Sequence, residues 1–139
     1  CCPFVISSET GEPLKEAEEN TLADSIAVGI PRNPIKALNA IKFSNGAWVS
    51  VPDSDIIKAM GLLGRTEGIF GEPAGVAAIA GIKKAVELGI IKPNETVTTI
   101  VTGNGLKDPV NGQKAVSMPD PLEPNMDKLD EYLRQKGAI

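Results

Sequence analysis

The chain has 139 residues, of which 42% are hydrophobic and 23% are charged, and its formal net charge is −4. This size and composition fit one globular domain that buries a core of its own. The lack of a basic cluster, together with only three Phe, one Tyr and one Trp, argues against a nucleic-acid partner. No apolar stretch reaches the length of a membrane span and no signal-peptide pattern is present, so we expect a cytoplasmic protein without a membrane partner.

Histidine is absent, and the only cysteines are the adjacent Cys1 and Cys2. Without histidine, Ser-His-Asp and Cys-His catalysis and most zinc sites are excluded. Two neighbouring thiols rarely form a disulfide and are too few for a metal cage, so we expect reduced thiols and no metal site. The chain starts Cys-Cys-Pro without Met, and we therefore expect it to be part of a longer protein.

The first elements in chain order are a loop and a helix. Two prolines and a glycine within residues 29–34 (GIPRNP) predict an ordered loop. Asn33-Pro34 is typical of a helix start, and Asn45-Gly46 is typical of a helix end. A helix is expected between these two signals.

Two further helices follow. Asp53 is expected to be the N-cap of the first, whose apolar face comprises Ile56, Ile57, Met60 and Leu63. The second has Pro73 in its first turn and Gly89 as a plausible C-cap. Its first half is nearly all Ala and Gly, so we expect it to pack very close to a neighbouring element.

Two stretches predict strands. Residues 47–51 (AWVSV) alternate in polarity, and residues 96–102 (TVTTIVT) form a β-branched run typical of a buried parallel strand. A Pro-rich connector and a charged helix at about 126–136 are expected to end the chain. Helices and strands that alternate with short connections predict an α/β fold. Because two strands are few, we expect a partial three-layer αβα architecture with a small, mostly parallel sheet.

Thr102 ends the second predicted strand, and Gly103 and Gly105 follow it. Ligands of parallel sheets bind beyond the carboxyl ends of the strands, so this hydroxyl is a candidate binding group. The alternative is a polar residue that closes a strand before an ordinary tight turn.

Charged residues offer weaker candidates. Arg32 could bind a phosphate or a carboxylate through two hydrogen bonds, or it could be a solvated surface arginine. Glu72 could act in catalysis, or its carboxylate could complement the dipole of the helix that starts at Pro73. Lys83, Lys84 and Lys107 are expected to be surface charges.

Three stretches carry a family resemblance: ADSIAVGIPRNP (23–34), EGIFGEPAGVAAIAGIKKAVELGII (67–91) and TVTTIVTGNGLKDP (96–109). In order and spacing they resemble the C-terminal portion of threonine synthase, a pyridoxal-phosphate (PLP) enzyme of the tryptophan-synthase-β fold type, also termed fold type II. The resemblance runs over residues 21–109. Threonine dehydratase shares the Glu-Pro-Ala/Ser element, but the GLKDP ending favours the synthase.

The resemblance implies PLP as the cofactor and assigns roles to several residues. Thr102 would lie beside the pyridine nitrogen, with Gly103 and Asn104 lining the ring. Many family members have His where this chain has Asn104. Glu72 and Ser25 are weaker candidates near the ring face, and Arg32 is a candidate for a substrate anion contact.

The implied activity of the intact enzyme is the conversion of O-phosphohomoserine and water to L-threonine and phosphate. The family's Schiff-base lysine and phosphate loop have no counterpart in this chain, so we expect no catalytic residue here and no activity from the chain alone. A homo-oligomer with an amino-acid substrate is expected. A related serine or threonine dehydratase or racemase, and a free-standing α/β ligand-binding or interaction module, remain alternatives.

Residues 1–139 are expected to form one domain-sized unit. Within it we predict an N-terminal helix and acidic connector at 1–20, a cofactor-domain core at 21–109, and a C-terminal connector and helix at 110–139.

Overall fold

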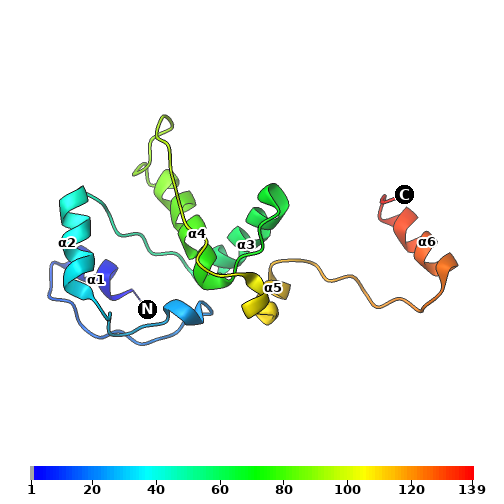
Figure 1. The fold of residues 1–139 in the computed structure, drawn as a ribbon, viewed down its shortest axis with the longest axis horizontal. Coiled ribbons are helices and arrows are strands. Elements are labelled where there is room, and N and C mark those ends of the chain that lie inside the picture. The colour runs from blue at the N-terminus through cyan, green and yellow to red at the C-terminus, as the bar shows by residue number, and fades with distance from the viewer. Residues whose placement is uncertain (1) are drawn as a thin grey trace.

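The structure, a computed structural model, describes residues 2–139 as a series of helices joined by loops (Figure 1). The α-helices are α1 (Pro3–Thr10), α2 (Pro34–Ser44), α3 (Asp53–Glu67), α4 (Pro73–Glu87), α5 (Pro109–Lys114) and α6 (Met126–Gln135). Two short 3-10 helices are η1 (Asp24–Ile26) and η2 (Gly105–Lys107). Over this described range, no helix combines the length and the apolar character that crossing a membrane requires.

The core lies between α3 and α4, which pack against each other at the centre of the molecule (Figure 1). Helical spacing brings the apolar side chains of each helix onto one face, and burying these faces stabilises the pair. The buried core residues are Ala23, Ile56, Ala59, Met60, Leu63, Val76 and Ala80. The apolar face predicted for α3 is confirmed, with Ile57 half-buried at its edge.

The predicted ends of α2 are also confirmed, whereas the prediction that Gly89 is the C-cap of α4 is wrong by one residue, because Leu88 occupies that position. Pro34 is the first residue of α2, and Asn45 ends the helix in the left-handed conformation, with φ of 51°. Gly89, just beyond α4, has φ of 68°, a conformation that glycine adopts without steric cost. Local capping chemistry therefore determines where these helices stop.

The prediction that Asp53 is the N-cap of α3 is wrong, because Pro52 occupies that position. Asp53 is the first residue of the helix, and its carboxylate accepts hydrogen bonds from a distant loop. The Thr21 hydroxyl donates at 2.6 Å and the Leu22 backbone N–H donates at 2.8 Å. Asp53 thus fastens the segment before η1 to the start of α3.

The predicted strands do not form within residues 2–139. Segments 47–51 and 96–102 carry no β-ladder, and the structure has one isolated antiparallel bridge, between Gly71 and Asn104. A strand needs the backbone groups of a neighbouring strand, and none lies beside either segment. The side chains of Val97 and Ile100 are consequently 43% and 74% exposed. The expected small parallel sheet is therefore absent from the described part of the chain.

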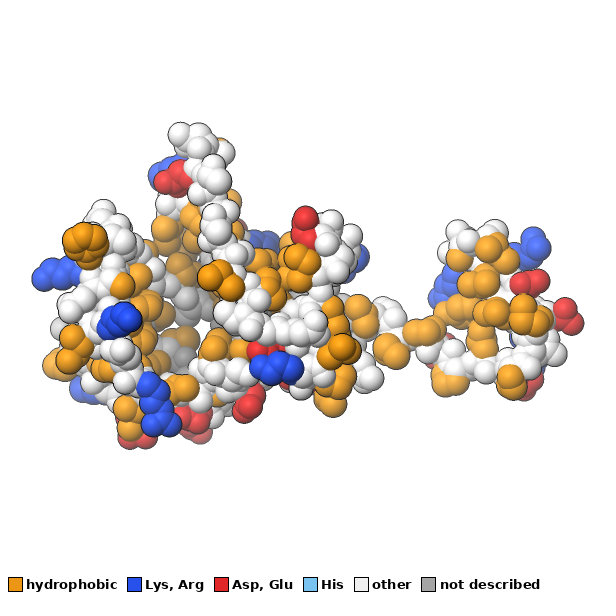
Figure 2. All heavy atoms as spheres, in the orientation of Figure 1, with side chains coloured by type: hydrophobic (Ala, Val, Ile, Leu, Met, Phe, Trp, Pro, Cys, Tyr) orange, Lys and Arg blue, Asp and Glu red, His pale blue; other side chains and the backbone are white. Residues whose placement is uncertain are grey.

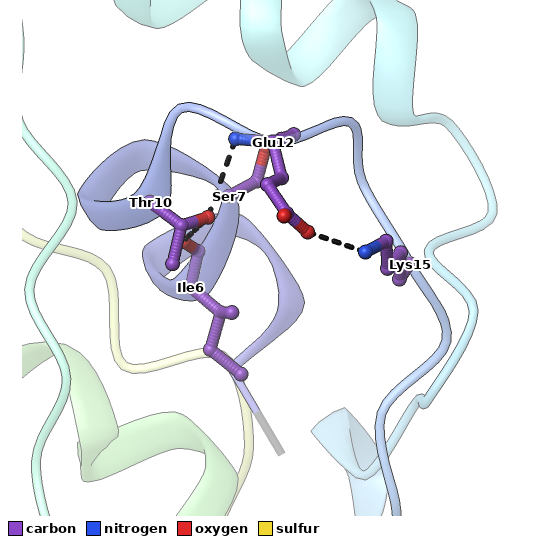
Figure 3. Close-up of polar contacts among 5 residues, drawn as sticks. All are labelled: Ile6, Ser7, Thr10, Glu12 and Lys15. Carbon is purple, nitrogen blue, oxygen red and sulfur yellow. Dashed lines mark hydrogen bonds and ion pairs between the residues drawn. The ribbon is translucent and has the colours of Figure 1, made fainter.

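Hydrogen bonds between nearby residues stabilise the turn after α1 (Figure 3). The Thr10 hydroxyl donates to the Ile6 carbonyl at 2.8 Å, and the Ser7 hydroxyl donates to the Glu12 carbonyl at 2.7 Å. The Glu12 carboxylate forms an ion pair with Lys15. These contacts direct the chain out of α1 into the acidic connector.

The C-terminal region contains one expected helix and one unexpected helix. Helix α5 forms within the stretch that we expected to be a connector, because Pro109 occupies its first turn and Asp108 caps it by accepting from the Asn111 N–H at 3.1 Å. Helix α6 lies at the far end of the remaining connector, separated from the other helices (Figures 1 and 2). Its start is capped by Asn125, whose side chain accepts from the Asp127 N–H at 2.8 Å.

Candidate functional site

Two of the three stretches that carry the family resemblance, 67–91 and 96–109, meet at the start of α4. The Glu72 N–H donates to the Gly103 carbonyl and the Gly105 N–H donates to the Phe70 carbonyl, each at 2.9 Å. The bridge between Gly71 and Asn104 lies between these two bonds. Residues 70–75 and 102–107, termed here the motif junction, therefore form one structural unit although they are far apart in the sequence.

Close backbone packing explains two glycines of the motif junction. A Cβ atom on Gly75 would lie 2.9 Å from the Gly103 nitrogen and 3.2 Å from the Thr102 nitrogen. A Cβ atom on Gly103 would collide with the Glu72 carboxylate. Both glycines thus permit the close approach of the loop to α4. Close packing was predicted for the Ala/Gly-rich helix start that contains Gly75, whereas Gly103 was predicted to line the cofactor ring.

Phe70 contributes the aromatic part of the motif junction. Its ring covers Gly105 and Gly112, where a Cβ atom would meet the ring; on Gly112 the separation would be 2.8 Å from Cζ. The Phe70 side chain remains 45% exposed. Sequence reasoning did not single out Phe70, because no local pattern indicates which glycines it would face.

Glu72 is the only buried polar or charged residue in the described part of the chain, with 5% of its surface exposed. It occupies the N-cap position of α4, yet its side chain makes no capping hydrogen bond there. Its Oε1 instead accepts from the Lys107 Nζ at 3.1 Å. The Glu72 carboxylate, which the sequence suggested as a partner of the α4 dipole, therefore forms an ion pair with Lys107.

Lys107 was expected to be a surface charge, and this interpretation is incomplete. Its side chain is 60% exposed, but its ammonium group pairs with the buried Glu72. The two residues are 35 positions apart, so no local spacing could have indicated the pair.

Ser25 and Glu72 line one polar cavity of about 220 Å³ at the start of α4. Ser25 is exposed and belongs to η1. The remaining lining residues are Leu22, Asp24, Pro73, Ala74, Lys107 and Asp108. The cavity thus offers a hydroxyl group, one ammonium group and three carboxylates to a small polar ligand.

Thr102 and Asn104 lie at the motif junction but outside this cavity. The Thr102 side chain is exposed, and among residues 2–139 its hydroxyl has no hydrogen-bond partner. The Asn104 side chain accepts from the Leu106 N–H at 2.9 Å and so caps η2. Thr102 is therefore available to a ligand, whereas the Asn104 oxygen already has a structural partner.

Arg32 lies at a different place. It is exposed and lines a cavity of about 270 Å³ together with Cys2, Phe4 and Trp48. The rings of Phe4 and Trp48 stack there with their centroids 4.6 Å apart. The Cys2 thiol is free, and Cys1, also predicted to be a reduced thiol, lies outside the described residues. The structure does not bring Arg32 to the motif junction.

Asp108 has a perturbed carboxyl group at the edge of the polar cavity. The Asn111 side chain donates to it at 2.6 Å and the Asn111 backbone N–H donates at 3.1 Å. These hydrogen bonds stabilise the charged form and lower the pKa of Asp108, with a smaller contribution from Lys114. The described side chains include no group of three or more His, Cys, Asp or Glu residues that could hold a metal ion.

Curated relatives with this motif order are named threonine synthase. The threonine synthase of Methanosarcina acetivorans is 42% identical over 138 residues, which is 98% of this chain and 34% of the relative. The threonine synthase of Methanocaldococcus jannaschii is 44% identical over 123 residues, covering 88% of this chain and 30% of the relative. The threonine synthase of Bacillus sp. (strain ULM1) is 46% identical over 99 residues, covering 71% of this chain and 28% of the relative. The chain spans about a third of the length of the relatives it matches most fully.

A family model described as "Pyridoxal-phosphate dependent enzyme" matches residues 1–103, which include Glu72, Thr102 and Gly103. This match and the relatives confirm the resemblance found in the sequence motifs. The chain belongs to the pyridoxal-phosphate dependent enzyme family.

Proposed function

We propose that this chain is part of a threonine synthase, which converts O-phosphohomoserine and water to L-threonine and phosphate with PLP as its cofactor. The observation that carries the proposal is the match of nearly the whole chain, both motifs of the junction included, to proteins named threonine synthase. The chain alone is expected to be inactive, because the intact enzyme requires a lysine and a phosphate-binding loop that no motif of this chain supplies.

Thr102 fits the cofactor because its hydroxyl is exposed and has no partner in the described residues. A neutral hydroxyl can hydrogen-bond to the pyridine nitrogen without forcing its protonation. When bound, PLP supplies an electron sink for the substrate carbon. We propose that Thr102, Gly103 and Asn104 hold the ring. Ser25 and Glu72 are proposed to contact it from the neighbouring cavity.

We further propose that residues 96–102 become a strand of a three-layer αβα domain in the intact enzyme. The β-branched side chains of this segment are largely exposed here, which supports a covering partner. Residues 21–109 would form the cofactor-domain core, flanked by 1–20 and 110–139. Arg32 would contact a substrate anion only if the intact enzyme brings its cavity to the cofactor. A cytoplasmic homo-oligomer acting on a small amino-acid substrate completes the proposal.

An assay of the intact enzyme tests the function. Purified protein is incubated with O-phosphohomoserine, with and without added PLP, and both threonine and phosphate are measured. We expect equal amounts of the two products, dependent on PLP. Formation of ammonia and a 2-oxo acid from serine or threonine, without threonine synthesis, would support the dehydratase alternative. Binding of a ligand without any turnover would support the module alternative.

Thr102→Val tests the proposed cofactor contact, because it keeps the β-branched shape and removes the hydroxyl. We expect PLP affinity to fall by an amount on the order of 0.5–1.5 kcal/mol, and turnover to fall further. Thr98→Val, the same change earlier in the segment, is the control and should leave PLP affinity unchanged. Full PLP affinity and turnover in Thr102→Val would show that this chain segment is not the pyridine site.

A further inference from the structure

We infer that Lys107 is a positioning residue of the proposed enzyme, because its ion pair with Glu72 fixes the loop that presents Thr102 to the cofactor. The inference rests on the proposed function and adds to it a residue outside the ring-contacting set. The contact that the structure gives the Lys107 ammonium group is with the Glu72 carboxylate. Lys107 acts through Glu72 and Gly103.

The first argument is burial. The Glu72 side chain is 7% exposed, and a buried carboxylate without a counter-charge is strongly destabilising. Lys58 and Asp55 on α3 form a pair of nearly the same length, 3.0 Å, but their side chains are 71% and 42% exposed. Solvent-exposed pairs of that kind contribute little. Lys107 and Lys58 therefore form ion pairs of similar length, but only the loss of Lys107 would leave a buried carboxylate without its partner.

The second argument is the path of contacts from Lys107 to Thr102. Lys107 binds the Glu72 Oε1, and the Glu72 side chain lies against Gly103 so closely that a Cβ atom there would collide with it. The Glu72 N–H also holds the Gly103 carbonyl at 2.9 Å. Because Gly103 directly follows Thr102, a displaced Glu72 side chain moves the Thr102 hydroxyl.

The third argument is the charge of the polar cavity. Asp24, Glu72 and Asp108 contribute carboxylates to its lining, whereas Lys107 contributes the single cation among the residues that line it. Removing the ammonium group leaves three carboxylates in proximity. Their mutual repulsion favours movement of the Glu72 side chain toward solvent, away from Gly103.

Replacing Lys107 in the intact enzyme tests the inference. Lys107→Met removes the charge and keeps the length of the side chain, and Lys107→Arg keeps the charge. Lys58→Met is the matched control. The readouts are the PLP dissociation constant from fluorescence titration, the absorption spectrum of the bound cofactor, and kcat and KM with O-phosphohomoserine.

We expect Lys107→Met to weaken PLP binding by about tenfold, which corresponds to about 1.4 kcal/mol. The absorption band of the bound cofactor should shift, and kcat should fall more than KM rises, because the ring is misplaced. Lys107→Arg should recover most of the affinity and the wild-type spectrum. Lys58→Met should match the wild type in all readouts.

A wild-type spectrum and PLP affinity in Lys107→Met would overturn the inference, as would equal effects of Lys107→Met and Lys58→Met. If Lys107→Met does not fold, the double variant Glu72→Gln/Lys107→Met removes the unpaired charge and should fold. In the Glu72→Gln background, removal of Lys107 should then cause little further loss of PLP affinity, since its partner charge is gone. A further tenfold loss there would overturn the inference.

These outcomes are distinct from a failure of the proposed function. A wild-type enzyme that binds PLP but makes no threonine contradicts the proposed reaction. The PLP titrations of the same variants still decide the role of Lys107.

Discussion

Helix α4 and the segment 94–102 that follows it meet at Gly75 and Thr102, yet they differ in what their own residues provide. Helix α4 satisfies its backbone hydrogen bonds internally and buries Val76 and Ala80 against α3. Segment 94–102 lacks a paired strand, and Ile100 is 74% exposed on it. Figure 2 shows hydrophobic side chains at the surface over this central region. A helix thus needs only one apolar neighbour, whereas a buried strand needs partners on its edges and its faces.

The largest expected effect is a loss of stability on truncating Ile100, which tests whether segment 94–102 is covered in the intact enzyme. If the intact enzyme covers this segment as proposed, Ile100→Ala should destabilise it by about 2–5 kcal/mol, the usual cost of truncating a buried isoleucine. Ile100→Val should cost only about 0.5–1.5 kcal/mol. Urea unfolding of the intact enzyme measures both. Unchanged stability in Ile100→Ala would mean that segment 94–102 remains uncovered.

The contact between the two regions is tested by two substitutions in one helix. Gly75→Ala should destabilise the protein by about 3 kcal/mol, because the new Cβ would press against backbone atoms of Thr102 and Gly103. Gly81→Ala places its Cβ in open space and should stabilise α4 by up to about 1 kcal/mol. Thermal unfolding compares the two. Effects of the same sign would contradict the packing described for Gly75.

Asp53, at the start of α3, is expected to stabilise the helical part of the molecule by anchoring the loop before η1. Asp53→Ala removes the acceptor for Thr21 and Leu22, and we expect a loss of about 2 kcal/mol, typical of hydrogen bonds to a charged group. Asp55→Ala removes the exposed pair with Lys58 and a first-turn carboxylate of α3 but leaves the loop contacts intact, so it should cost less, about 0.5–1 kcal/mol. Chemical denaturation provides both values. Equal losses would show that Asp53 does not anchor the loop.

The smallest expected effect is a pH dependence at Asp108. Hydrogen bonds from Asn111 lower the pKa of its carboxyl group in the folded protein, so the charged form stabilises α5. This contribution is complete above the unfolded pKa of about 3.9 and is lost as pH falls through the lower folded value. NMR titration of the Asp108 carboxyl carbon measures the shift. Asn111→Ala should move the midpoint upward; an unchanged midpoint would contradict this cause.

The helices could be predicted from the sequence because their signals are local. Pro34, Pro73 and Asn45 mark helix ends through their own backbone preferences, and the spacing of Ile56, Met60 and Leu63 defines the buried face of α3. The strand prediction for 96–102 rested on its β-branched residues, which are typical of a strand buried between other elements. That environment must be supplied by other segments, so the described residues cannot form it.

The residues of the candidate site also divide into those that a local motif indicates and those that only the fold brings together. Thr102, Gly103 and Glu72 were predicted as site residues from their motifs, and the structure places all three at the motif junction, while their contact with the cofactor stays a prediction. The pairing of Lys107 with Glu72 could not be identified, because it depends on how two distant segments are brought together. Arg32 had a suitable chemistry but lies at another cavity. Residue type alone does not decide which groups meet.

The Phe70 ring over Gly105 and Gly112 has a consequence for building chimeric enzymes. Because a side chain at either glycine would collide with the ring, these three positions can be exchanged between relatives only as a set. A crossover placed between α4 and residue 102 would combine one parent's aromatic residue with the other parent's loop. Crossovers before residue 70 or after residue 112 keep the set together. Recombination libraries are therefore expected to yield folded proteins more often from these outer boundaries.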